Sequence, residues 1–85
     1  EIEEVIRQHP EVADCGVVGL ADEEWGEIVA VVLVLKSALD VQGLNTWLRE
    51  RLPGYKVPRK YLVKEELPRN AMGKVTKNDL KGMFD

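Results

Sequence analysis

The feature that most constrains the fold of this chain is an apolar run, Ile28–Leu35, which contains only Ile, Val, Ala and Leu. The run is rich in β-branched residues and does not alternate with polar ones, which is typical of a central strand covered on both faces. It is far too short to cross a bilayer, so we expect no membrane span. A chain of 85 residues built around such a strand forms one domain with a modest core.

The hydrophobic pattern on either side of this run predicts an α+β fold. Strands are expected near 12–20, 27–36 and 59–64, forming a small three-stranded sheet, and helices near 1–9, 40–52 and 76–84. Asp40 is expected to cap the second helix, while Thr76 and Asp79 form a capping box for the third. An acidic turn over 21–27 is expected to separate the first two strands.

Four side chains that could take part in chemistry are better explained as structural. Cys15 is the single cysteine and lies in an apolar stretch, so we expect a buried thiol. His9 is the single histidine, so it has no second histidine with which to share a metal, and we expect a helix end in solvent. Trp47 is expected in the core, and Trp25 is expected to pack rather than to contact a substrate. No metal site is predicted.

Charge is distributed unevenly along the chain. Residues 1–55 contain 4 Lys and Arg against 11 Asp and Glu, whereas residues 56–85 contain 8 against 4. A cationic C-terminal third suits a phosphorylated ligand or an acidic partner, and it equally suits a solvated surface. Nucleic acid is not expected as a partner, because the pI is about 5.2 and the lysines are not interleaved with stacking aromatics.

The pair Gly73-Lys74 contains the most chemical information, and it falls in the loop predicted before the third helix. Glycine permits a tight turn, and the lysine beyond it presents a flexible cation to an anion. A phosphate-binding P-loop would need a glycine five positions before Gly73 and a hydroxyl residue after the lysine. This chain has Pro68 and Val75 at those positions, which excludes a P-loop.

Five motifs along the chain occur in the order of one known family. They are Glu1-Ile2-Glu3, His9-Pro10-x-Val12, Asp22-Glu23-Glu24-Trp25-Gly26-Glu27, Leu52-Pro53-x-Tyr55-Lys56-Val57-Pro58 and Pro68-Arg69-Asn70-Ala71-Met72-Gly73-Lys74. Together they resemble the C-terminal domain of adenylate-forming enzymes, the acyl-CoA synthetases and their relatives. Within that family the segment from Arg69 to Asn78 is most similar to malonyl-CoA synthetases. Lys77 departs from the pattern, since many members have arginine there and lysine does not make an arginine's bidentate contact.

The resemblance implies an acid–thiol ligase that converts a carboxylic acid and ATP to an acyl-adenylate and then transfers the acyl group to CoA. It implies that Lys74 enters the active site for adenylation and that Mg²⁺ helps to hold the phosphates. Weaker candidates for cofactor contacts are Gly73, Lys56, Arg69 and Lys77. Most of the site would belong to a larger N-terminal adenylation domain, on which this chain acts as a mobile lid. We therefore expect an excised fragment, inactive alone, of a cytoplasmic enzyme of fatty acid metabolism.

Two other classes of protein remain open. A stand-alone α+β binding module would use its basic face to hold a nucleotide or an acidic partner. A structural α+β interaction domain would use Gly73-Lys74 as an ordinary turn. Upstream sequence separates the three, because an enzyme of this family has a Ser/Thr/Gly-rich phosphate loop ending in lysine and an Arg-containing hinge shortly before Glu1.

Overall fold

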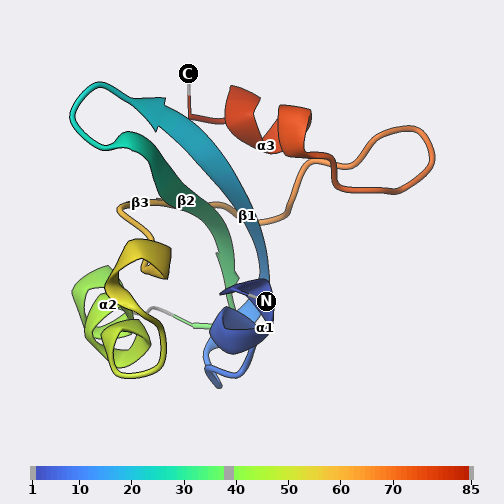
Figure 1. Cartoon of the computed structure of the whole chain (residues 1–85). Helices are drawn as coiled ribbons and strands as arrows, with labels where there is room; N and C mark the ends of the chain where they lie inside the picture. Colours follow the sequence, from blue (N-terminus) through green and yellow to red (C-terminus); the bar gives the residue numbers. More distant parts are fainter. Residues whose placement is uncertain (1, 38–39, 85) are drawn as a thin grey trace.

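The computed structural model describes residues 2–37 and 40–84, and a three-stranded sheet lies at its centre (Figure 1). The central strand is β2 (Gly26–Leu35), which contains the apolar run. It pairs antiparallel with β1 (Val12–Asp22) and parallel with β3 (Lys60–Val63). With three helices around this sheet, the predicted α+β fold is confirmed.

The side chains of β2 enter two separate apolar clusters on opposite faces of the sheet. Val31 and Leu33 pack with residues of α1 (Ile2–Arg7) and α2 (Val41–Arg49). Ala30 and Val32 pack in a second cluster with α3 (Lys77–Gly82), which Figure 1 shows on the other side of the sheet from α2. Because all four side chains are 0% exposed, neither face of this central stretch of β2 reaches water, which explains why the run has no polar residue there.

The turn between β1 and β2 is tighter than the acidic segment 21–27 suggested, since the strands continue to Asp22 and resume at Gly26. The Asp22 carboxylate accepts hydrogen bonds from the backbone N–H groups of Glu24 and Trp25, both at 2.9 Å. Gly26 has φ 81°, a left-handed value that favours glycine. Asp22 provides acceptors for the backbone N–H groups of the turn, and Gly26 adopts the positive φ that the turn requires. The pairing of β1 with β2 therefore extends to Asp22 and Gly26, next to the turn.

Side-chain caps begin α2 and α3, as the sequence predicted. The Asp40 carboxylate accepts from the Gln42 N–H at 3.0 Å. The Thr76 hydroxyl oxygen accepts from the Asp79 N–H at 3.2 Å, and the hydroxyl donates to the Asp79 carboxylate at 2.8 Å.

All three helices are shorter than expected, ending at Arg7, Arg49 and Gly82, and Glu1 lies outside the described residues. A short 3₁₀ helix that was not predicted, η1 (Gly54–Lys56), follows α2. None of the helices in the described part of the chain has the length and apolar character that a membrane crossing requires.

Of the four residues interpreted as structural, two lie as predicted and two differ from the prediction in their exposure. Cys15 is buried and Trp47 packs against the α1/α2 cluster, as predicted. His9 lies just after the end of α1, as expected, but it is half-buried rather than in solvent, because its ring meets Trp47 edge-on at a centroid distance of 5.0 Å. The ring is held there because His9 Nδ1 accepts the backbone N–H of Glu11 at 3.1 Å. Trp25 was expected to pack, yet it belongs to neither core cluster and is 59% exposed, with the Arg59 guanidinium 4.3 Å from its ring centroid.

Candidate functional site

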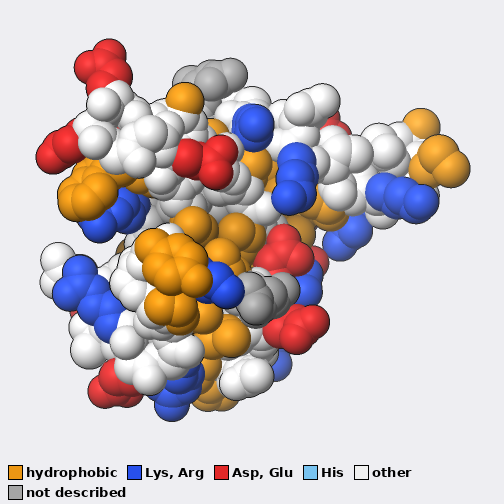
Figure 2. Space-filling view, viewed as in Figure 1, with side chains coloured by type: hydrophobic (Ala, Val, Ile, Leu, Met, Phe, Trp, Pro, Cys, Tyr) orange, Lys and Arg blue, Asp and Glu red, His pale blue; other side chains and the backbone are white. Residues whose placement is uncertain are grey.

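The candidate catalytic residue, Lys74, lies on the segment between β3 and α3. Figure 1 shows this segment projecting away from the sheet as a long loop, and Figure 2 shows Lys and Arg side chains along the projection. The loop, residues 68–76, contains no helix or strand. Its shape therefore depends on individual hydrogen bonds.

Asn70 closes this loop into a defined turn. Its side-chain oxygen accepts the backbone N–H groups of Met72 at 2.9 Å and Lys74 at 3.0 Å. Its own backbone N–H donates to the Lys74 carbonyl at 2.9 Å, and its carbonyl accepts from the Gly73 N–H at 2.8 Å. A turn of this kind gives the Lys74 side chain a fixed starting point.

Gly73 has a conformational reason to be glycine, as the sequence suggested. Its φ is 79°, in the left-handed region. No atom lies within 4 Å of the position that a Cβ would occupy, so space is not the constraint. The turn requires a residue that adopts a positive φ without strain.

The Lys74 side chain is exposed and has no internal partner. Within residues 2–37 and 40–84 it makes no hydrogen bond or ion pair. A lysine ammonium is a compact charge with three donors on a flexible stem. In this structure it is available to an anion that approaches from outside the domain.

Of the three other charged candidates, Arg69 lies within this loop, Lys77 directly follows it, and Lys56 lies elsewhere. Arg69 donates to the Gly73 carbonyl at 3.3 Å and to the Asp14 carboxylate at 3.4 Å. Lys77, the first residue of α3, lines with Arg69 a cleft of about 400 Å³. Lys56 belongs to η1, with its ammonium 5.8 Å from the centroid of the Tyr55 ring. It therefore lies on a different element from the Lys74 loop.

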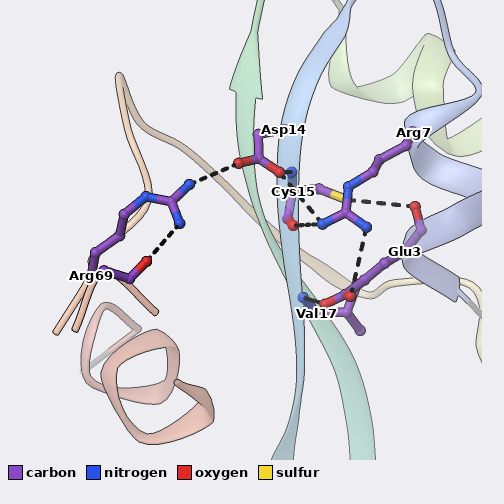
Figure 3. A network of polar contacts seen from close by, with 7 residues as sticks. Glu3, Arg7, Asp14, Cys15, Val17 and Arg69 are labelled. Carbon is purple, nitrogen blue, oxygen red and sulfur yellow. Dashed lines mark hydrogen bonds and ion pairs between the residues drawn. The ribbon is translucent and has the colours of Figure 1, made fainter. Parts of the chain in front are cut away.

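Sequence reasoning missed Asp14, which connects the loop to β1 and α1 (Figure 3). One carboxylate oxygen lies 3.4 Å from Arg69, and the other accepts from Arg7 at 3.4 Å and from the Cys15 N–H at 2.9 Å. Arg7 in turn donates to the Cys15 carbonyl at 3.2 Å and lies 3.9 Å from Glu3. The available signal was a charged residue inside the otherwise apolar strand 12–20.

Cys15 lies beside this network but is not suited to chemistry. Burial raises the pKa of its thiol from 9.0 to about 11, and the nearby Arg7 guanidinium acts in the opposite direction. The thiol therefore stays protonated at neutral pH, whereas a nucleophile or a metal ligand must be a thiolate. The described residues also contain no group of three or more His, Cys, Asp or Glu that could hold a metal ion.

Related sequences lead to one family. The family "AMP-binding enzyme C-terminal domain" matches residues 1–74. The chain is 40% identical to malonate–CoA ligase of Arabidopsis thaliana, over 95% of this chain and 15% of that protein. It is 42% identical to 2-succinylbenzoate–CoA ligase of Bacillus subtilis, over 95% of this chain and 17% of that protein. The chain thus spans less than a fifth of the length of either relative.

Solved structures share the fold as well as the sequence. The o-succinylbenzoate CoA synthetase of Bacillus subtilis, in complex with its acyl-adenylate intermediate, matches with a TM-score of 0.88 and 42% identity, over 95% of this chain and 17% of that one. An amide bond synthetase from Marinactinospora thermotolerans matches with a TM-score of 0.90 and 29% identity, over 98% and 17%. The match of the family over residues 1–74, together with this agreement in fold, shows that the chain belongs to the AMP-binding enzyme C-terminal domain family.

Proposed function

We propose that this chain is the mobile C-terminal domain of an acid–thiol ligase, an acyl-CoA synthetase, and that it supplies Lys74 to the adenylation step. One observation supports this most directly. In a member of this family, a glycine-dependent turn presents an exposed ammonium that has no partner among the described residues. An exposed lysine by itself is ordinary on a protein surface, so the membership of this family is what gives the turn its proposed role.

The chemistry requires a cation at this point. In adenylation, a carboxylate oxygen of the acid attacks the α-phosphorus of ATP, the acyl-adenylate forms and pyrophosphate leaves. Two anions must approach each other while negative charge builds on the phosphoryl oxygens, and a positioned ammonium lowers that barrier. In the proposed role, Lys74 contacts both the carboxylate and oxygens of the nucleotide. In the second step the thiol of CoA attacks the acyl carbonyl and AMP leaves.

The remainder of the active site is assigned to an N-terminal adenylation domain. Most of the length of each curated relative lies outside the matched part. One related structure is an o-succinylbenzoate CoA synthetase in complex with ATP and magnesium ion. Mg²⁺, when bound, neutralises phosphate charge, and the described residues offer no cluster that could hold it. We therefore place the metal, adenine and acyl sites outside this chain and predict that the chain alone is inactive.

The proposed lid movement is consistent with the packing of the domain. The two apolar clusters share β2, so the helices on both faces are packed on one sheet and the domain can move as one body about a hinge before Glu1. Such a movement would bring Lys74 to the adenylation site and then withdraw it before CoA reacts.

The acid is proposed only as a carboxylic acid. Malonate–CoA ligase and 2-succinylbenzoate–CoA ligase are about equally similar to this chain, at 40% and 42% identity. The resemblance to malonyl-CoA synthetases therefore does not select malonate. Roles in fatty acid metabolism and in the cytoplasm stay predictions.

The decisive experiment replaces Lys74 in the full-length protein that contains this domain. Lys74→Ala should lower the rate of adenylation by roughly a hundredfold or more, because one preorganised charge at a developing anion contributes about 3–4 kcal/mol to transition-state stabilisation. Pyrophosphate release measures this step. Thioester formation from supplied acyl-adenylate should be largely retained, since that step does not need the cation.

A matched control replaces Lys81, another exposed lysine of the same C-terminal region, on α3. Lys81→Ala should leave both half-reactions unchanged. If Lys74→Ala slowed both half-reactions equally, or slowed neither, the proposed role of Lys74 would be wrong.

A further inference from the structure

We infer that Arg69 is a positioning residue for Lys74: it joins the Lys74 loop to β1 through Asp14 and so fixes where the ammonium is presented. The inference rests on the proposed function of Lys74. It assigns Arg69 a different role from the cofactor contact suggested by its charge, because its guanidinium is already engaged by groups of this domain.

The loop needs such a connection because its other hydrogen bonds are local. The bonds of Asn70 all end within residues 70–74, so they set the shape of the turn but not its position relative to the sheet. At the far end of the loop, Val75 packs against the cluster on the α3 face, and Thr76 caps α3. Directly before the loop, Leu67 is buried in the same cluster, so both ends of the loop are anchored by packing. Within the loop itself, among the described residues, the side-chain hydrogen bond that reaches the sheet is that of Arg69.

Arg69 can hold both sides at once (Figure 3). One guanidinium nitrogen donates to the carbonyl of Gly73, the residue before Lys74, at 3.3 Å. A second guanidinium nitrogen, Nη2, donates to the carboxylate of Asp14, which is 55 positions away in the sequence, at 3.4 Å. A guanidinium presents its nitrogens in a rigid plane, so two bonds from one group fix a direction as well as a distance.

A β-bulge places Asp14 on the correct face of the sheet. Val12 pairs with Leu35 and Asp14 pairs with Val34, which leaves Ala13 as an extra residue. Val12 and Cys15 both enter the α1/α2 cluster, so the alternation of faces changes between them. Without the bulge Asp14 would share the face of Val12. With it, Asp14 lies on the side of the Lys74 loop.

Asp14 is also held in place from its other side. Its second oxygen accepts from the Cys15 N–H at 2.9 Å and from Arg7 of α1 at 3.4 Å. The side chains of Arg69, Arg7 and Asp14 are 52%, 48% and 31% exposed. Ion pairs with this exposure contribute little to folding stability. Their effect should therefore appear in the geometry of the loop rather than in the unfolding transition.

The test uses adenylation kinetics of the full-length protein. Arg69→Ala should lower kcat for adenylation by roughly 10- to 100-fold, because a displacement of about 1 Å in a reacting group has effects of this size. The KM values for ATP and acid should stay nearly constant. Asp14→Ala should reproduce the loss, and Arg69→Lys should recover only part of the activity. Arg51→Ala, which removes an exposed, ion-paired arginine from the turn after α2, is the control and should have no effect on adenylation.

A double variant separates positioning from other roles. If Arg69 acts through Lys74, then Arg69→Ala should cause no further loss in a Lys74→Ala background. A further loss in that background would overturn the inference, and so would a raised KM for ATP with unchanged kcat, which would mean direct contact with the nucleotide. Full activity of Arg69→Ala, with Lys74→Ala inactive, would reject positioning and leave the proposed function intact. Full activity of Lys74→Ala would reject the proposed function itself.

Discussion

The core between β2 and α2 and the Lys74 loop, residues 68–76, are held by different kinds of interaction. In the core, Leu33, Leu44 and Leu48 are 0% exposed and pack without direction-specific bonds. In the loop, Met72 is 79% exposed, and the turn is kept by the polar bonds of Asn70 and by the conformation of Gly73. Apolar burial decides whether the domain folds, and a few polar bonds decide where its cation lies. The two properties should therefore respond to different substitutions.

The largest effect on the core side of this comparison is expected for Leu33→Ala. The residue lies on β2, the central strand of the sheet, with no exposed surface, and truncating such a leucine costs about 2–5 kcal/mol of unfolding free energy. Chemical denaturation of the 85-residue chain measures this loss. Molecules that remain folded should keep the Lys74 loop unchanged, because Leu33 has no bond to it.

The matched control for Leu33 is its neighbour across the sheet. Val63 on β3 pairs with Leu33 in the parallel register and is 48% exposed. Val63→Ala should cost a fraction of the free energy lost in Leu33→Ala. Equal costs at the two positions would break the comparison, because burial would then not explain the difference.

On the loop side, acetylation of Lys74 is predicted to stop adenylation without unfolding the domain. In the proposed role of Lys74, acetylation removes the positive charge that would meet two anions and adds bulk to a side chain that would enter a closed site. The expected loss is comparable to that of Lys74→Ala, about a hundredfold or more. The measurement is adenylation by full-length protein acetylated at Lys74 alone, beside its thermal unfolding midpoint.

The matched control for this prediction is acetylation of Lys81 on α3, which should change neither quantity. Retained adenylation after acetylation of Lys74 would reject the switch. A lowered unfolding midpoint would show instead that the loop and the core are coupled, contrary to the comparison.

The core could be predicted from sequence because its signals are local. The unbroken apolar run had to be a strand covered on both faces, and the capping residues marked where two helices begin. The lengths of α2 and α3 were overestimated. Leu52 and Phe84 pack against the core, so their apolar character suggested helix, but the two helices end before them, at Arg49 and Gly82. An apolar residue in helical register predicts burial more reliably than it predicts helix.

The connections of the loop could be predicted only in part. Gly73 and Thr76 are local signals, so the turn and the position of Lys74 before α3 were expected. Asp14 was not recognised, because its face depends on the bulge at Ala13, and a bulge is a property of pairing with β2. The exposure of Trp25 was also misjudged: it lies in the turn between β1 and β2, belongs to neither core cluster, and contacts the Arg59 guanidinium.

The smallest expected effect concerns Cys15, which belongs to the core but adjoins the polar network beneath the loop. Its thiol donates to the Glu3 carbonyl at 3.7 Å, and burial raises its pKa from 9.0 to about 11. The folded state therefore holds this proton more tightly than the unfolded state. The resulting stabilisation is fully present below pH 9 and is lost as the pH rises from about 9 to 11.

A comparison with Cys15→Ala isolates this contribution. Burial also raises the pKa of Tyr61, but that residue titrates in both proteins and cancels in the difference. The unfolding free energy of the unsubstituted chain, measured by urea denaturation, should fall more steeply than that of the variant between pH 9 and 11, and the curves should be parallel between pH 6 and 8. Parallel curves over the whole range would mean that the thiol is not shielded from solvent. In that case water would reach the core beside Asp14, and Cys15 would belong to the solvated network of Asp14, Arg7 and Arg69 rather than to the packed core.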